Sequence, residues 1–190
     1  EESMLTLYNQ YNFQGDLYFD GYNLNGGGQL KTDFYSIKSA HNYFSNNNIM
    51  SADAKFLIYD RIQHNVCQFL SNSVSVEHNL DKENIIIYKS THQFILPIIQ
   101  YHVDFEAVLF DIKSSKLNFI NYDVLLGSLY SLKYGKTPFK YNTLNAVYNL
   151  NNDELCVQDG LQLAVKKYWI QPAKNEFCVL ENGDFPIFKK

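Results

Sequence analysis

The sequence predicts an α+β domain with a mainly antiparallel central sheet and helices packed on it. Apolar residues recur at three- and four-residue spacing over residues 51–70, a pattern typical of an amphipathic helix. Short apolar runs separated by polar turns follow between residues 84 and 122, a pattern typical of strands. The length of 190 residues fits one domain, 1–190. We expect residues 51–190 to form its core and residues 1–50, rich in Asn, Tyr and Gly, to contribute a substrate-contacting region.

The first third of the chain is predicted to hold two helices and a loop. Gly26-Gly27-Gly28 predicts a loop or turn, because three consecutive glycines favour neither a strand nor a helix. Residues 35–44 are predicted to be a short helix, and residues 51–70 a longer one that Ser51 caps. His64 and Cys67 share a face of that second helix, but no further ligands at matching spacing accompany them, so packing is expected there rather than a metal site.

The middle of the chain is predicted to be rich in strands. Residues 107–112 and 117–122 flank the polar turn Lys113-Ser-Ser-Lys116 and read as an antiparallel hairpin. We further expect strands at 85–88, 94–99, 144–150 and 177–180, helices at 124–134 and 156–168, and a break at 135–138.

Charge and composition exclude several classes of protein. Sixteen basic residues against 20 acidic ones give a net charge of -4, so no nucleic-acid partner is expected. No apolar run reaches the roughly 18 residues of a membrane span, so a membrane-spanning protein is not expected. Arg61 is the single arginine, so bidentate recognition of phosphate or carboxylate rests on it alone. The three cysteines, Cys67, Cys156 and Cys178, are an odd and sparse set that predicts free thiols in a reducing compartment.

Four polar residues at predicted element ends suggest nucleophilic chemistry. Cys156 begins the last long predicted helix, and the partial positive charge of a helix N-terminus favours the thiolate. His102 lies between two strands, where its imidazole could take the thiol proton. A third group would orient that ring. Asn121 and Asp123 both end the hairpin's second strand, and charge favours Asp123.

The segment from Phe94 through His102 and Asp111 to Asp123 resembles the clan of ubiquitin-like-protein proteases, as does Asp153-Glu-Leu-Cys156. That clan includes SUMO-deconjugating, adenovirus-type and bacterial effector cysteine proteases. The resemblance implies the papain-like architecture of that clan, with Cys156 as nucleophile and His102 as base. It places Asn121 at the position of the triad acid and leaves Asn151 or Asn152 in place of the usual oxyanion-hole glutamine. Val103 and Val157 depart from the clan's pattern.

The function implied by this resemblance is cleavage of ubiquitin or a ubiquitin-like modifier after its C-terminal glycine tail. Such an enzyme needs no metal or cofactor and is expected to be a monomer. From a bacterial source it would be a secreted effector that acts in the host cell cytoplasm, and otherwise an intracellular protein. Two alternatives stay open at this point, namely an effector acetyltransferase on the same fold and a catalytically degenerate interaction module.

Overall fold

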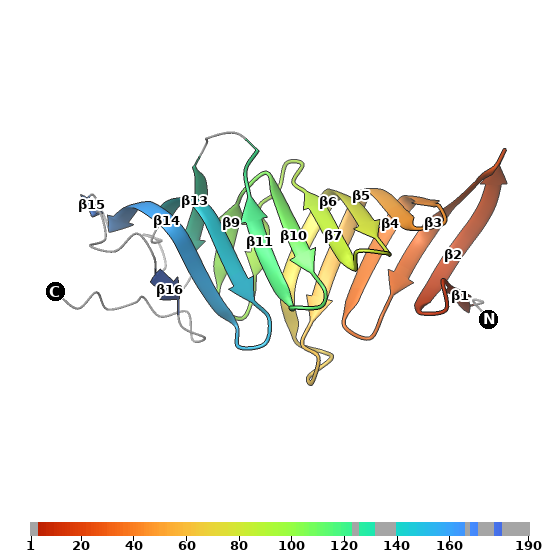
Figure 1. Ribbon diagram of the computed structural model, residues 1–190, viewed down its shortest axis with the longest axis horizontal. Coiled ribbons are helices and arrows are strands. Elements are labelled where there is room, and N and C mark those ends of the chain that lie inside the picture. The colour runs from red at the N-terminus through yellow and green to blue at the C-terminus, as the bar shows by residue number, and fades with distance from the viewer. Residues whose placement is uncertain (1–3, 123–125, 132–139, 166–167, 171–176, 180–190) are drawn as a thin grey trace. The chain divides into compact units, whose positions relative to one another are not determined.

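The computed structural model describes residues 4–122, 126–131, 140–165, 168–170 and 177–179. These residues form sixteen strands and no helix (Figure 1). The protein is therefore all-β, and the predicted α+β class with its papain-like architecture is wrong. The chain divides into two compact units, Glu1–His92 and Gln93–Lys190. Residue 51, where we expected the core to begin, lies inside a strand of the first unit.

The first unit is an antiparallel meander in which each strand pairs with the next one along the chain. Short turns join most of these strands, as is usual for consecutive antiparallel hairpins, and a longer loop over residues 60–66 joins β5 to β6. Its strands are β1 (Met4–Leu7), β2 (Tyr11–Asp20), β3 (Asn23–Lys31), β4 (Tyr35–Phe44), β5 (Asn48–Tyr59), β6 (Cys67–Asn79) and β7 (Asn84–Tyr88).

Alternation of apolar and polar residues explains why these segments are strands. On β2, Tyr11 and Phe13 are buried, whereas Asn12 and Gln14, which alternate with them, are exposed. Successive side chains of a strand point to opposite faces, so this pattern gives the sheet one buried face and one outer face. The buried face carries an aromatic and aliphatic core that includes Leu30, Tyr35, Ile37, Phe56, Ile58, Phe69, Val74, Val76, Ile85 and Ile87.

The two helices predicted in this unit are strands, and the predicted N-terminal helices are wrong. Residues 35–44 are β4, and residues 51–70 divide between β5 and β6. Ile58 and Phe69 lie directly opposite each other across the β5–β6 pair, although eleven residues of sequence separate them. Two strand patterns joined by a loop thus produced apolar spacings that imitate a helix.

Gly26-Gly27-Gly28 lies within β3, so the predicted loop is also wrong. Gly15 and Gly28 face each other across β2–β3, and a Cβ on Gly28 would lie 2.3 Å from the carbonyl oxygen of Gln14. The same Cβ would lie 2.9 Å from the ring of Phe13, which covers this glycine. The glycines therefore permit a close approach of two backbones that any side chain would prevent.

The sheet of the first unit curls on its buried face. Tyr11 on β2 and His78 on β6 belong to strands with three others between them, yet their ring centroids are 5.3 Å apart. Irregular register between Ser51 and Phe56 gives β5 bulges, and Asp53 there has a φ of 47°. Bulges bend a strand and increase its twist, which brings distant strands of one sheet together.

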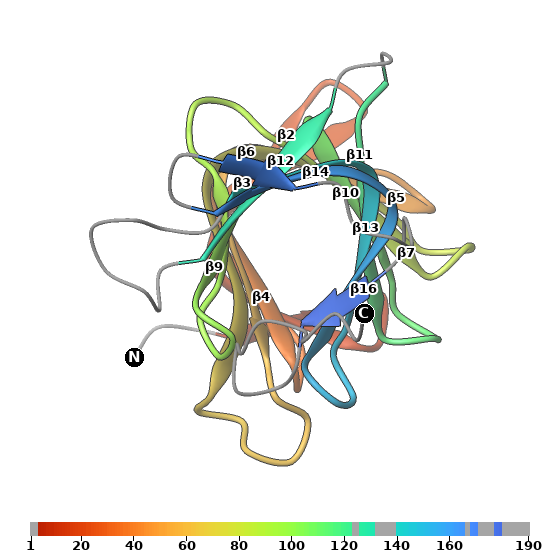
Figure 2. The same cartoon turned by 90° about the vertical axis from the view of Figure 1, so that its left-hand side faces the viewer.

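The second unit is also antiparallel, with β13 as its central strand. One edge of β13 pairs with β12 and then β11, and the other edge pairs with β14. Figures 1 and 2 show β13 and β14 as strongly curved ribbons. Its strands are β8 (Phe94–Leu96), β9 (Tyr101–Asp104), β10 (Ala107–Asp111), β11 (Lys116–Ile120), β12 (Gly127–Ser131), β13 (Lys140–Asn149), β14 (Glu154–Val165), β15 (Tyr168–Ile170) and β16 (Phe177–Val179).

Several strand predictions between residue 84 and the C-terminal part of the chain are confirmed. The hairpin around Lys113-Ser-Ser-Lys116 is β10 paired with β11, and the strands expected near 85–88, 94–99, 144–150 and 177–180 are all present in whole or in part. The helix expected at 156–168 is wrong, because β14 occupies most of that range. The helix expected at 124–134 contains β12, and the break expected at 135–138 lies outside the described residues.

Candidate functional site

Cys156 lies in a setting that differs from the one predicted for the nucleophile. It lies in β14 and not at a helix N-terminus, so no helix dipole favours its thiolate. Cys156 is also disulfide-bonded, and the residue directly opposite it across β14–β16 is Cys178. Directly opposite residues of antiparallel strands have Cα atoms about 4.5–5.5 Å apart, within the span of a disulfide. The expectation of three free thiols is therefore wrong, and among the described residues Cys67 is the free cysteine.

Two strands, β12 and β13, lie between the strand of His102 and that of Cys156 in the sheet order. It lies half-buried on β9, where its Nδ1 is 3.2 Å from Oε1 of Gln93. Through β12 and β13 the strand register links His102 to Ala164 on β14. Cys156 precedes Ala164 by eight residues, which is about 26 Å along a strand, and three strand spacings add about 14 Å across the sheet. The strand register therefore does not place His102 and Cys156 opposite each other.

The remaining predicted site residues have local structural roles. The Asn121 side-chain oxygen accepts a hydrogen bond of 2.8 Å from the backbone N–H of Glu106, and Asp123 lies outside the described residues. Asn151 and Asn152 are exposed in the turn between β13 and β14. The Asn152 amide donates to Glu154 over 3.2 Å, as is common for asparagine in a turn.

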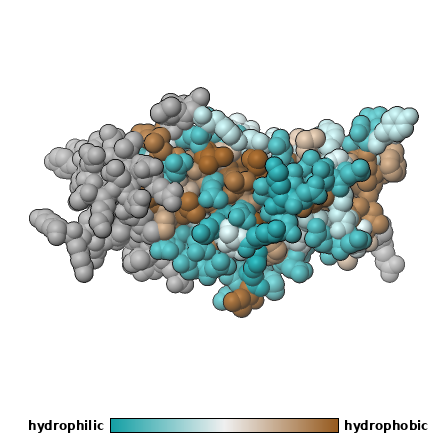
Figure 3. Space-filling model, viewed as in Figure 1, coloured by the Kyte–Doolittle hydropathy of each residue, from teal (hydrophilic) through white to brown (hydrophobic). Residues whose placement is uncertain are grey.

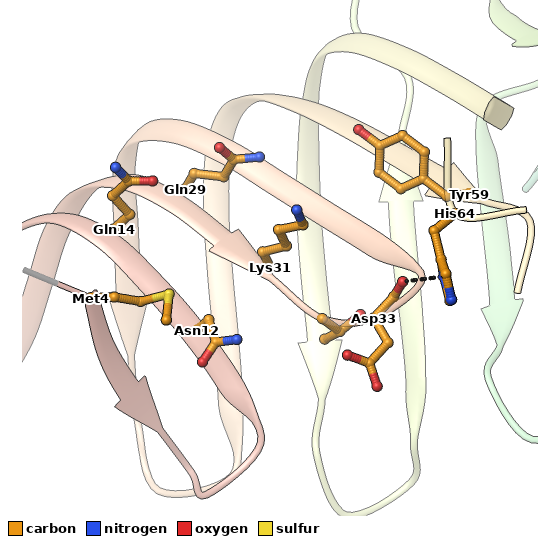
Figure 4. Close-up of a pocket in the computed structure, with 9 residues that line it drawn as sticks. Met4, Asn12, Gln14, Gln29, Lys31, Asp33, Tyr59 and His64 are labelled. Carbon is orange, nitrogen blue, oxygen red and sulfur yellow. Dashed lines mark hydrogen bonds between the residues drawn. The ribbon is translucent and has the colours of Figure 1, made fainter. Parts of the chain in front are cut away.

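The first unit has a polar groove on its outer face, which Figure 4 shows in close-up. The cavity is about 650 Å³ in volume. In Figure 4 the side chains of Gln14, Gln29 and Lys31 extend on the same side of the sheet, and Tyr59 and His64 close one end. We call this cavity the polar groove; it is lined by Met4, Asn12, Gln14, Gln29, Lys31, Thr32, Asp33, Tyr59 and His64.

Strand register explains how these side chains gather. Asn12 lies directly opposite Lys31, and Gln14 directly opposite Gln29, across the β2–β3 pair. Directly opposite residues share one face of a sheet, so the outward-facing side chains of β2 and β3 together form one wall of the groove. His64, from the loop after β5, is fixed by a 3.2 Å contact between its Nδ1 and the backbone oxygen of Asp33 (Figure 4).

A row of lysines continues from this groove across the outer face. Gln29 on β3 lies opposite Lys38 on β4, and Lys38 lies opposite Lys55 on β5. We call Lys31, Lys38 and Lys55 the lysine cluster; all three are exposed, and none has an ion-pair partner within the described residues. Like charges directly opposite each other destabilise a sheet. An anion bound between Lys38 and Lys55 would remove that repulsion.

The acidic residues near the groove do not neutralise the cluster. The Asp33 carboxylate points away from the Lys31 ammonium group in Figure 4. The Asp60 carboxylate accepts the backbone N–H groups of Ile62 and Gln63, over 2.8 and 2.6 Å, and so belongs to its own loop. Figure 3 shows a mainly hydrophilic surface over the strands of the first unit, interrupted by hydrophobic side chains.

Sequence reasoning missed the groove because it assigned no strands before residue 84. The signal was present in Tyr11-Asn-Phe-Gln14 and Gln29-Leu-Lys31, which alternate buried and exposed side chains. The alternating pattern predicts a strand with one buried and one exposed face. It does not reveal that Lys38 and Lys55 lie opposite each other, because that depends on how the strands pair.

Other classes of site receive no support from the described residues. They contain no group of three or more His, Cys, Asp or Glu side chains arranged to hold a metal ion. No helix that could cross a membrane occurs in them. Comparison with protein families, curated proteins and solved structures gives no match for this chain.

Proposed function

We propose that the first unit is a non-catalytic binding module that holds an acidic glycan on its outer face. The observation that carries this proposal is the lysine cluster beside an amide-lined groove. Lysine ammonium groups donate hydrogen bonds to carboxylate or sulfate, and amides can both donate to and accept from sugar hydroxyls. The proposal extends the interaction module that was one of the alternatives from the sequence.

The choice of a glycan over a nucleic acid rests on arginine and on overall charge. The guanidinium carbon of Arg61 lies 4.3 Å from the centre of the Phe34 ring. This cation–π contact engages the guanidinium group of the only arginine in the sequence. The planar guanidinium group of arginine can bind phosphate with two parallel hydrogen bonds, whereas the ammonium group of lysine acts as a point charge. The net charge of -4 also opposes wide contact with a phosphate backbone.

The cysteine chemistry supports the same proposal. A disulfide at Cys156 suits a protein that works outside a reducing cytosol, because disulfides persist in oxidising compartments. Extracellular surfaces and matrices are also where acidic polysaccharides are abundant.

Calorimetric titration with oligogalacturonate, a chain of uronic acids, tests the proposal. We expect the double variant Lys38→Gln/Lys55→Gln to bind at least about tenfold more weakly than the unmodified protein. The matched control is Lys113→Gln/Lys116→Gln in the second unit, which changes the net charge equally and should retain affinity. Equal loss in both variants, or tighter binding of single-stranded RNA than of the glycan, would contradict the proposal.

Hydrolysis of ubiquitin conjugates by Cys156 and His102 stays a prediction of the sequence, as does acetyl transfer. The disulfide and the separation of the two residues both oppose a thiolate mechanism. A ubiquitin or SUMO probe with a C-terminal electrophile tests the protease directly. We expect no adduct at Cys156, and an adduct there would restore the protease hypothesis.

A further inference from the structure

Two exposed tyrosines flank one buried asparagine on the outer face of the first unit. Tyr18 on β2 lies directly opposite Asn25 on β3, and Asn25 lies directly opposite Tyr43 on β4. Directly opposite residues share a face, so the three side chains form a row across three strands. Tyr18 and Tyr43 are 53% and 46% exposed, so both rings are accessible from solvent.

The asparagine in this row has an unsatisfied polar group. Asn25 is only 6% exposed, and its Oδ1 has no hydrogen-bond partner. A buried amide oxygen without a partner destabilises a fold, and such groups are uncommon in folded proteins. A ligand hydroxyl seated between the tyrosines could supply the missing hydrogen bond after a small rotation of either ring.

The spacing of the row fits sugar rings. Because β3 separates β2 from β4, the Cα atoms of Tyr18 and Tyr43 lie about 10 Å apart, or two strand spacings. That length is close to one disaccharide unit of an extended glycan. The faces of pyranose rings carry apolar C–H groups that pack on aromatic rings, and their edges carry hydroxyls that pair with amides.

We propose that Tyr18, Asn25 and Tyr43 form a stacking subsite for two neutral sugar rings. This inference rests on the proposed glycan-binding function and names a second part of the same face. Asp16 is exposed two residues before Tyr18 on the same strand face, so an acidic sugar would be repelled there. The row continues to Met50 and Glu77, which line a hollow of about 310 Å³ that leaves room for a longer chain.

Binding of neutral tetrasaccharides to the full chain tests the subsite. We expect at least one of cellotetraose, maltotetraose and chitotetraose to bind, and Tyr18→Ala or Tyr43→Ala to weaken that binding at least about tenfold. Tyr18→Phe and Tyr43→Phe keep the stacking ring and should retain most of the affinity. Asn25→Ala should lose affinity as well, because it removes the hydrogen-bonding amide. Tyr122→Ala is the matched control, since Tyr122 is 61% exposed in the second unit.

The lysine variant separates this inference from the proposed function. Lys38→Gln/Lys55→Gln should leave binding of the neutral tetrasaccharide unchanged while it weakens binding of oligogalacturonate. If oligogalacturonate binding depends on the lysines but no neutral tetrasaccharide binds, the subsite is wrong and the proposed function stands. If a neutral tetrasaccharide binds equally well to Tyr18→Ala, Tyr43→Ala and the unmodified protein, the subsite is also overturned.

Discussion

His78 is the buried titratable residue with the clearest consequence for this protein. It is 1% exposed, and its Nε2 lies 3.4 Å from the Tyr11 hydroxyl. The rings of Tyr11 and Tyr35 pack against it edge-on, and its Nδ1 has no hydrogen-bond partner. Burial disfavours the imidazolium form and lowers the pKa of His78 to about 4.

Acid should therefore destabilise the fold through His78. Between pH 6.5 and 4 the unfolded chain binds a proton at this residue that the native chain does not bind. Its contribution to stability is present above about pH 6.5 and is lost as the pH falls towards 4. We expect a loss of about 2 kcal/mol in the free energy of unfolding between pH 7 and pH 5.

Urea unfolding at the two pH values measures this loss. His78→Phe should remove most of the difference, whereas His41→Phe, at an exposed position of β4, should keep it. The same pH dependence in His78→Phe as in the unmodified protein would show that other groups cause it.

The packing of strand β3 against strand β2 depends on Gly28. Gly28→Ala would place a Cβ 2.3 Å from the Gln14 carbonyl oxygen and 2.8 Å from Cα of Gly15, so the backbones of β2 and β3 must separate. We expect a loss of about 1–3 kcal/mol, measured by chemical denaturation, as for other overpacked sites.

The control for Gly28 is Gly21→Asn in the β2–β3 turn. Gly21 has a φ of 63°, which asparagine tolerates, and no atom lies within 4 Å of the position of its missing Cβ. This variant should stay within about 0.5 kcal/mol of the unmodified protein. Equal stability of the two variants would mean that β2 and β3 do not approach as closely as described.

The disulfide-bonded cysteine of strand β14 leads to a prediction about the number of free thiols. Because Cys156 is disulfide-bonded and lies opposite Cys178, the chain should expose one thiol, that of Cys67, when it is denatured without a reductant. Alkylation followed by peptide mass spectrometry counts the modified cysteines. Three alkylated cysteines would contradict this pairing and would leave Cys156 available for thiolate chemistry.

The elements that the sequence predicted well are those with local signals. The β10–β11 hairpin was predicted because two short apolar runs flank a four-residue polar turn, and the pairing of Phe110 with Leu117 is local. In contrast, the spacing of Ile58, Ile62, Val66 and Phe69 suited a helix, and only the pairing of Ile58 with Phe69 across two strands reveals β5 and β6. Gly28 resembled a loop residue because its partner Gly15 is thirteen residues away.

The candidate site was less predictable than the fold. Lys31, Lys38 and Lys55 are ordinary surface lysines in the sequence, and their proximity exists only in the assembled sheet. His102 and Cys156 had the order and residue types of a catalytic pair, but residue types do not determine the register that separates them.

At the scale of the whole molecule, the chain combines two antiparallel β units, of which the first carries the features that suit a ligand. Its outer face holds the polar groove, the lysine cluster and the Tyr18–Tyr43 row on the same strands β2 to β5. Because the curled sheet buries its aromatic core on one face only, the outer face remains available for binding.

The most direct test is a backbone-amide NMR titration of the full chain with oligogalacturonate. We predict saturable shifts at Gln29, Lys31, Lys38 and Lys55, which weaken as salt is added because the contacts are ionic. The amides of β10 and β11 in the second unit should not shift. Shifts confined to the second unit, or none at millimolar glycan, would contradict a glycan-binding outer face.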